Sequence, residues 1–288
     1  MLLTDPAFIR QLESLTLLSR KVLGGTLQAD RKSLRKGSGT TFADYSEYCP
    51  GDDYRAIDWR VCARLDSLMI KLFELEEDVT LYFLLDASRS METKFLYAQQ
   101  LVAALAYVAI HGMDKVVIYS MADDLVCIAG PTQGRGKILA MLRMLETAAP
   151  FGSATDFTGA SRRLCRWQRR RGMVIVVSDF FFAGGFEEGL QFLQWNHHDL
   201  FCIQVQDQKD RQCPLRGDVE LACVESGASR KLTITGRQAR AYEQAVLDWN
   251  DRLARFCKAR GIGLVSTTTE VPFDDLIRSV LRRGGLVS

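Results

Sequence analysis

Short apolar runs alternate with longer segments of helical periodicity along most of this chain, and this alternation limits the possible folds more than any other feature. The runs, rich in β-branched and aromatic residues, cover residues 79–86, 115–121, 125–129, 173–179, 199–207 and 262–268. Continuous apolar runs of this length are typical of strands buried on both faces of a parallel sheet. Helices between such strands supply the crossovers that a parallel sheet requires. We therefore predict an α/β fold with a doubly wound, mostly parallel sheet.

The remaining elements divide the chain into two parts. Helical spacing predicts helices over residues 7–23, 93–112, 136–148, 155–172 and 237–260 and from 273 onward. A small hairpin is expected from residues 219–224 and 230–235, turning at Ser226 and Gly227. The basic segment RKSLRKGSGTT (31–41) is predicted to be an exposed loop. We expect an N-terminal helix and β extension over residues 1–78, and a main domain over residues 79–288 with a hairpin insertion near 217–236.

The composition indicates a globular protein with no strong general affinity for polyanions. The chain has 288 residues, 47% of them hydrophobic and 25% charged, with a formal net charge of +2. This charge does not favour nucleic acid or an anionic membrane as a partner. No run reaches the roughly 18 apolar residues of a membrane span, and the N-terminus lacks the pattern of a signal peptide. The eight cysteines show no C-x-x-C spacing, so we expect free thiols and a cytoplasmic protein.

Oxygen-bearing side chains follow two of the predicted strands. In a doubly wound sheet, ligands bind beyond the carboxyl ends of the strands. Asp86 and Asp179 are the two carboxylates that directly follow an apolar run, and Ser88 and Ser90 alternate after Asp86. If the two strands are neighbours, these residues meet Thr155 of the GSATD loop. Because only oxygen ligands are present, the sequence predicts a site for Mg²⁺ or Mn²⁺.

A purely structural explanation of these residues stays open. Asp and Ser are also common turn and N-cap residues, and Ser90 or Glu92 can begin the next helix. The strand before Asp86, the matching strand end at Asp179 and the GSATD loop between them favour the metal site.

The same three segments resemble a known family. DASRS is similar to the D-x-S-x-S of the metal-ion-dependent adhesion site of von Willebrand factor type A domains, GSATDFTGA to its threonine loop and VVSDF to its last aspartate. The resemblance covers about residues 79–207 and implies a Rossmann-like fold. It also implies that Ser88, Ser90 and Thr155 contact the metal directly, and that Asp86 and Asp179 act mostly through water. Thr158 is a rival to Thr155 in the same loop.

A second resemblance covers the segment before the strand. YCPGDDYRAIDWRVCARLDSLMIKLFELEED, followed by DASRSM, resembles the bacterial domain of unknown function family 58, most closely over residues 40–91. This resemblance implies a von Willebrand-like fold with an N-terminal β extension and a functional link to MoxR-type AAA+ ATPases. Larger relatives carry membrane helices, whereas a short soluble form is expected here. Asp58, Arg55, Arg60 and Arg64 are expected to pair with one another, mainly in a structural role.

The motifs favour a binding module over an enzyme. None of the three histidines, at positions 111, 197 and 198, lies at a carboxyl strand end, and no G-x-S-x-G, Walker or G-x-G-x-x-G motif occurs. A metal held by hydroxyls and outer carboxylates keeps an open position for a carboxylate of a partner protein. We expect that partner to be a MoxR-type ATPase or its client. The alternative is a metal-dependent phosphoesterase or other hydrolase that uses the same carboxylates. The arginines of RRLCRWQRRRG (162–172) are expected to form a solvated face or, alternatively, a surface for an acidic partner.

Overall fold

The protein is described from a computed structural model. The structure describes residues 3–23, 41–74, 80–152, 155–213, 215, 217–222, 229–271 and 275–276. The predicted loop at 31–40, the hairpin turn at Ser226 and Gly227 and most of the helix predicted from 273 lie outside these residues. The chain forms two compact units, a large one from residues 1–20 and 79–288 and a small one from residues 21–78.

A six-stranded sheet is the centre of the large unit. Its strand order is β10-β7-β6-β3-β4-β5. The strands are β3 (Thr80–Asp86), β4 (Lys115–Met121), β5 (Leu125–Thr132), β6 (Met173–Ser178), β7 (Asp199–Gln206) and β10 (Gly263–Thr268). All neighbours run parallel except β5, which pairs antiparallel with β4 at one edge. The four inner strands are almost wholly buried, as expected for a sheet covered on both faces. The predicted α/β class with a doubly wound, mostly parallel sheet is confirmed.

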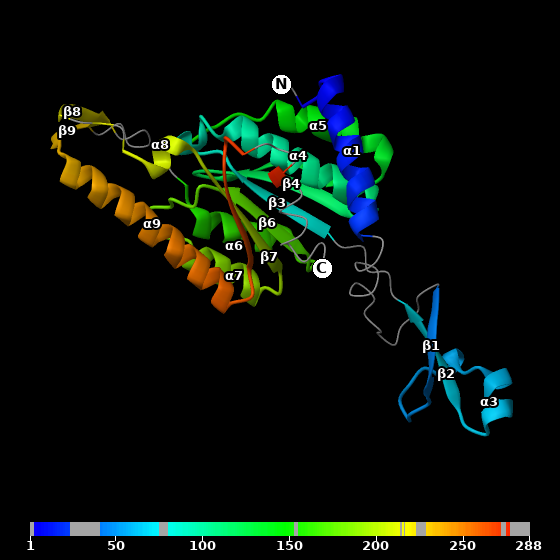
Figure 1. Cartoon of the computed structure of the whole chain (residues 1–288). Helices are drawn as coiled ribbons and strands as arrows, with labels where there is room; N and C mark the ends of the chain where they lie inside the picture. Colours follow the sequence, from blue (N-terminus) through cyan, green and yellow to red (C-terminus); the bar gives the residue numbers. More distant parts are fainter. Residues whose placement is uncertain are drawn as a thin grey trace. The chain divides into compact units, whose positions relative to one another are not determined.

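Helices cover both faces of this sheet (Figure 1). The α-helices of this part of the chain are α1 (Pro6–Leu23), α4 (Phe95–His111), α5 (Ile138–Glu146), α6 (Phe157–Trp167), α7 (Glu187–Trp195), the short α8 (Gln208–Arg211) and α9 (Gly236–Ala259). Helix α4 packs on β3 and β4. Within the part of the chain that the structure describes, no helix combines the length and the apolar composition needed to cross a bilayer.

The alternation of side chains along β3 produces two buried layers. Tyr82 and Leu84 point into a hydrophobic cluster with Phe157 of α6, Leu190 of α7 and Leu253 of α9. The odd-numbered residues of β3 point to the opposite face, where 12 of the 17 residues of α4 are buried. Because β3 is buried on both faces along its length, polar side chains occur at its carboxyl end.

Helix α1 belongs to the large unit as far as Arg20. Its Phe8, Leu12 and Leu15 are buried, and the hydroxyl of Thr4, just before it, donates to Glu146 Oε2 at 2.8 Å. The sequence grouped this helix with the β extension, and that grouping is corrected here. The helix has an apolar stripe, and its residues Phe8, Leu12 and Leu15 bury that stripe within the large unit.

The small unit is a two-stranded hairpin with short helices. β1 (Thr41–Glu47) pairs antiparallel with β2 (Met69–Glu74), and the 3-10 helix η1 (Tyr54–Ala56) and α3 (Trp59–Leu65) lie between them in the chain. Asp58 caps α3 by accepting from the Arg60 backbone N–H. Its carboxylate also bonds Lys71 at 2.9 Å and the Tyr45 hydroxyl at 3.0 Å. The sequence predicted pairing of Asp58 with arginines, but its ionic partner is Lys71.

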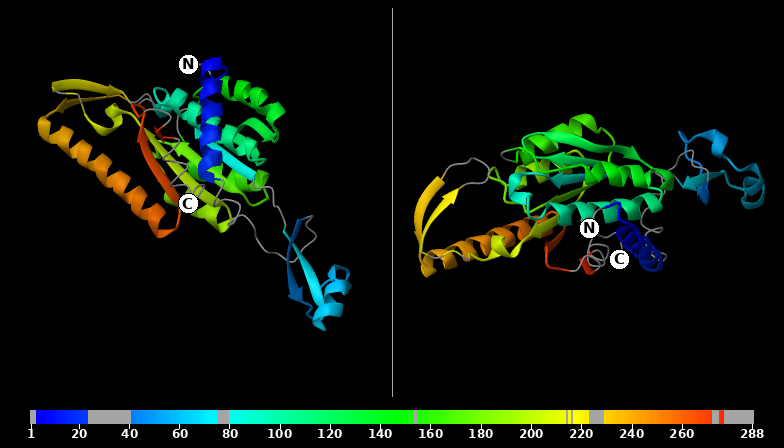
Figure 2. Two further views of the ribbon diagram at one scale, coloured as in Figure 1. Left: turned by 45° about the vertical axis from the view of Figure 1, so that its right-hand side comes forward. Right: turned by 90° about the horizontal axis from the view of Figure 1, so that it is seen from above.

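Several elements differ from the sequence prediction. Helix α6 ends at Trp167, not at Gly172, because Gln168 takes an extended backbone and its side chain donates to the Tyr119 hydroxyl at 2.7 Å. Helices α3, α7 and α8 were not predicted; each has nine residues or fewer, too few for a clear period. The hairpin strands β8 (Gly217–Ala222) and β9 (Ser229–Ile234) were predicted, and β9 lies against the first turns of α9 (Figure 2).

Candidate metal site at the strand ends

Two neighbouring strands bring the predicted site residues to one edge of the sheet. β3 and β6 pair in parallel, with Leu85 opposite Val177. Asp86 is the last residue of β3, and it lies beside the end of β6, where Ser178 is the last strand residue and Asp179 follows it. Adjacent parallel strands place their carboxyl ends together, and the crevice beyond them is the usual ligand position in doubly wound sheets.

Asp86 is a buried carboxylate held by neutral donors. Its side chain is 1% exposed. Oδ1 accepts from the Ser88 N–H at 3.0 Å and from the Thr155 hydroxyl at 3.3 Å, and Oδ2 accepts from the Ser178 hydroxyl at 2.5 Å. Burial and the nearby charge of Asp179 raise the pKa of Asp86 to about 6, although the bonds from Ser178 and Ser88 oppose that rise. Among the described residues, no lysine or arginine contacts this carboxylate.

The two serines of the motif converge. Their Oγ atoms lie 2.9 Å apart, with Ser88 buried and Ser90 partly exposed. The hydroxyl of Thr155 approaches the same carboxylate from the loop before α6. Asp156 begins that helix by accepting from the Gly159 N–H, which leaves Thr155 just outside the helix. Of the two rival threonines, Thr155 is therefore the one that bonds Asp86.

Asp179 has a different environment, which the sequence did not predict. It is 2% exposed, and its Oδ1 accepts from the Phe181 N–H at 3.0 Å. Its Oδ2 lies 2.6 Å from Nζ of Lys94, a lysine that is itself 1% exposed. Nζ of Lys94 also lies 2.8 Å from Oδ2 of Asp210. Burial alone would lower the pKa of Lys94, but the two carboxylates outweigh it and raise that pKa.

A signal for Lys94 was present in the sequence. The residue is the N-cap of α4, and a cation at a helix N-terminus is disfavoured by the helix dipole. A lysine in this position, at the start of an apolar helix, indicates that an acidic partner lies elsewhere in the chain. The sequence alone does not say which one.

A third carboxylate follows a strand of the sheet. Asp207 comes directly after β7, and it forms a capping box with Asp210 at the start of α8. The Thr93 hydroxyl donates to Asp207 at 2.9 Å. Burial would raise the pKa of Asp207, but these bonds and the charge of Lys94 lower it. The sequence-based count of two carboxylates at strand ends is therefore wrong; there are three, and the third caps a helix.

The donor set around Asp86 fits a hard divalent cation. Two hydroxyl oxygens lie close together beside a buried carboxylate whose described partners are all neutral, and such oxygen ligands suit Mg²⁺ or Mn²⁺. The fit is weaker at Asp179, whose charge Lys94 already neutralises in part. No group of three or more His, Cys, Asp or Glu side chains with the arrangement of a metal site is found in the described part of the chain. The role of Asp86, Ser88, Ser90, Thr155 and Asp179 as metal ligands stays a prediction.

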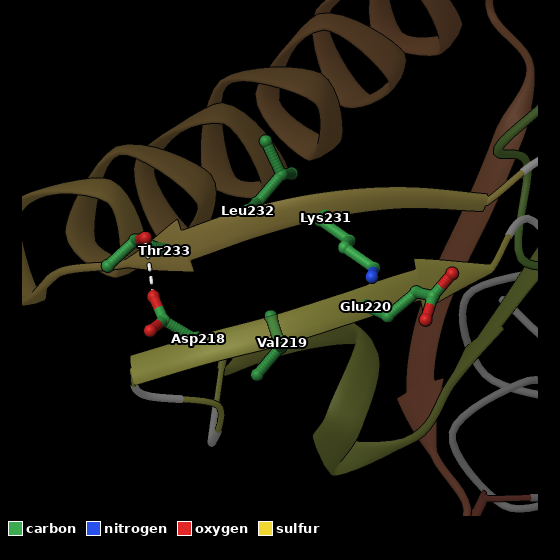
Figure 3. A pocket seen from close by; sticks show the side chains of 6 residues that line it. All are labelled: Asp218, Val219, Glu220, Lys231, Leu232 and Thr233. Carbon is green, nitrogen blue, oxygen red and sulfur yellow. Dashed lines mark hydrogen bonds between the residues drawn. The ribbon is translucent and has the colours of Figure 1, made fainter.

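A separate hollow lies on the β8–β9 hairpin. Figure 3 shows its lining by Asp218, Val219, Glu220, Lys231, Leu232 and Thr233, with the Thr233 hydroxyl donating to Asp218 at 2.6 Å. It has a volume of about 440 Å³. None of the five predicted site residues lines it, so the strand-end site is a different place.

The strand order, the antiparallel edge strand and the polar strand ends define an α/β fold with a doubly wound, mostly parallel sheet whose polar side chains gather at the carboxyl ends of the strands. The chain belongs to the family described as "Protein of unknown function DUF58", whose profile matches residues 44–251. That match confirms the resemblance of the sequence to the bacterial domain of unknown function family 58.

The chain is similar to sequence relatives from mycobacteria and to several solved structures. The uncharacterized protein Rv1480 of Mycobacterium tuberculosis is 28% identical over 293 residues, which cover 98% of this chain and 92% of that protein. BatB from Bacteroides thetaiotaomicron has a TM-score of 0.44 and 16% identity, and the match covers 72% of this chain and 98% of that one. A von Willebrand factor type A protein from Catenulispora acidiphila has a TM-score of 0.41 and 10% identity, with 73% and 42% covered.

A metal-bound structure is also among the similar folds. The manganese-loaded TRAP protein of Plasmodium vivax has a TM-score of 0.34 and 19% identity, and the match covers 44% of this chain and 57% of that one. The fold assignment rests on the strand order itself.

Proposed function

We propose that this protein is a metal-dependent protein-binding module, an adaptor or co-chaperone that works with a MoxR-type AAA+ ATPase. A Mg²⁺ or Mn²⁺ ion at the strand-end site would be held by Ser88, Ser90 and Thr155, with Asp86 and Asp179 acting through water. The observation that supports this proposal is the buried Asp86 carboxylate, which is bonded only to neutral groups among the described residues and faces two converging hydroxyls.

The chemistry of the donor set favours binding of a partner carboxylate. Hydroxyl ligands bring no negative charge, so an ion held by them keeps much of its positive charge and at least one open position. A carboxylate of a partner protein makes a strong charge-assisted contact with such an ion. The sequence resemblance names a MoxR-type ATPase, or a client delivered to it, as that partner. We propose a binding role without turnover.

The metal half of the proposal is tested by titration of Mn²⁺ into metal-free protein by calorimetry. The wild type should bind one ion and should melt at a higher temperature with it. Thr155→Ala and Asp86→Ala should lose most of the metal-dependent increase, whereas Thr158→Ala, a matched control three residues away, should keep it. Equal responses of Thr155→Ala and the wild type would contradict the assignment of this ligand.

The partner half is tested with the ATPase purified without nucleotide. Ser90→Ala should weaken binding, because losing one contact to a desolvated ion costs about 2–5 kcal/mol, or roughly thirty-fold or more in affinity. Variants are preferable to chelation, since the ATPase itself uses a metal. Unchanged affinity in Ser90→Ala and Thr155→Ala would show that the partner binds elsewhere. Hydrolysis of nucleotides or esters by purified protein that is lost in Asp179→Ala would replace the binding role with an enzymatic one.

A further inference from the structure

Lys94 is a buried cation that the proposed metal site does not require. Its side chain is 1% exposed, and Nζ lies 2.6 Å from Asp179 and 2.8 Å from Asp210. A charge removed from water in this way is stable only when it is closely paired. Two carboxylates share one ammonium, so these three side chains together carry a net negative charge.

Lys94 connects the strand-end site to helix α8. Asp179 directly follows Ser178, the residue whose hydroxyl bonds Asp86. Asp210 belongs to α8, where its carboxylate also accepts from the backbone N–H of Asp207. The Tyr242 hydroxyl of α9 donates to the Asp210 carbonyl at 2.9 Å. The ammonium therefore bonds to a predicted metal ligand on one side and to an anchored helix on the other.

Lys94 and Asp210 have opposite effects on a divalent ion near Asp179. The ammonium repels such an ion and already neutralises part of the charge that would attract it. Asp210 adds a negative charge and accepts a hydrogen bond from the same ammonium. The ammonium therefore neutralises less of the charge of Asp179. A charge within a few ångströms shifts the proton equilibrium of a neighbouring acid by roughly tenfold to a thousandfold, and we expect its field to act on a divalent ion in the same direction.

We propose that Lys94 and Asp210 set the affinity of the metal site. Lys94 is a positioning residue and an internal cation: it holds Asp179 in place when no metal is bound, and it lowers the affinity for a divalent ion. Asp210 counteracts it. This inference rests on the proposed metal site at Asp86 and Asp179.

The test is calorimetric titration of Mn²⁺ into the full-length chain. Lys94→Met should bind Mn²⁺ at least about tenfold more tightly than the wild type. Asp210→Asn should bind it about tenfold more weakly, because the ammonium then acts on Asp179 without a counter-charge. Lys209→Met is the matched control, because Lys209 is an exposed lysine next to Asp210 on α8. The affinity of this variant for Mn²⁺ should stay within about twofold of the wild type. In EDTA, Lys94→Met should melt at a lower temperature than the wild type. Added Mn²⁺ should raise the melting temperature of Lys94→Met by more than it raises that of the wild type.

The affinity for Mn²⁺ should rise in Lys94→Met and fall in Asp210→Asn, and these opposite changes separate the proposed role from a merely structural one. If both Lys94→Met and Asp210→Asn bind Mn²⁺ more weakly, or if neither changes, the inference is overturned while the metal site stands. If Lys94→Met binds the ion and the wild type does not, the internal cation is supported and the metal-dependent function is overturned. If no variant binds Mn²⁺, both are overturned.

Discussion

Replacing Asp86 by Asn should stabilise the metal-free protein at neutral pH, even though it removes a buried and hydrogen-bonded carboxylate. The reason is the raised pKa of Asp86, about 6 against an ordinary 3.8. A carboxyl group with a raised pKa in the folded state favours folding only while it is protonated. Its contribution is complete below about pH 3.8 and is lost as the pH rises through about 6.

The size of the effect follows from that difference. At 1.36 kcal/mol per pH unit, the gap between 3.8 and about 6 corresponds to about 3 kcal/mol of folding free energy lost above pH 6. Asn carries no charge and avoids that loss. Its amide nitrogen no longer accepts the bond that Ser178 donates to Asp86 Oδ2, which costs about 1 kcal/mol. The variant should therefore gain about 2 kcal/mol near pH 8 and lose about 1 kcal/mol near pH 4.

The assay is urea unfolding in EDTA at both pH values, with Asp179→Asn as the matched control. The two carboxylates end adjacent strands and are equally buried, but Asp179 is paired with Lys94. Removing its charge leaves the ammonium with one partner fewer, so Asp179→Asn should be less stable at about pH 8. A loss of stability in Asp86→Asn at that pH would refute the reasoning, because hydrogen bonds to the carboxylate would then outweigh its burial.

Two further predictions concern folding. In Gly172→Ala, the added Cβ would lie 2.2 Å from the Thr80 carbonyl oxygen, and thermal melting should show a loss of stability of about 1–3 kcal/mol or more. The control is Gly130→Ala, where nothing lies within 4 Å of the added Cβ and the variant should melt like the wild type. Equal losses of stability in the two variants would contradict the clash. In Asp58→Asn, the Asn keeps the helix cap and loses the ion pair with Lys71 that lowers the pKa of Asp58 to about 2. Hydrogen exchange of the β1 and β2 amides in the full-length chain should be faster in this variant above about pH 4, and the difference should fade as the pH drops through about 2; a difference that persists below pH 2 would point to packing instead of charge.

The sequence predicted the sheet and the strand-end positions because both depend on local pattern. Continuous apolar runs mark strands buried on two faces, and the position of Asp86 or Asp179 follows directly from where such a run ends. Helix α3 was missed because its seven residues depend on a cap from Asp58, which also bonds Lys71. Lys94 was missed for a stronger reason: its two partners lie 85 and 116 positions away in the chain. No spacing rule joins residues that only the winding of the sheet brings together.

The different surroundings of the two strand-end carboxylates indicate where a divalent ion would act. Asp86 and Asp179 end neighbouring strands at equal depth, yet one is bonded by N–H and hydroxyl dipoles and the other by an ammonium. Burial and the nearby charge of Asp179 raise the pKa of Asp86, and the neutral dipoles bonded to it do not offset that rise. A charge paired with a lysine has little left to attract a second cation. At the proposed metal site, an ion would therefore be drawn to the Asp86 side, where the Ser88 and Ser90 hydroxyls converge, and the Lys94 pair would limit how strongly Asp179 contributes.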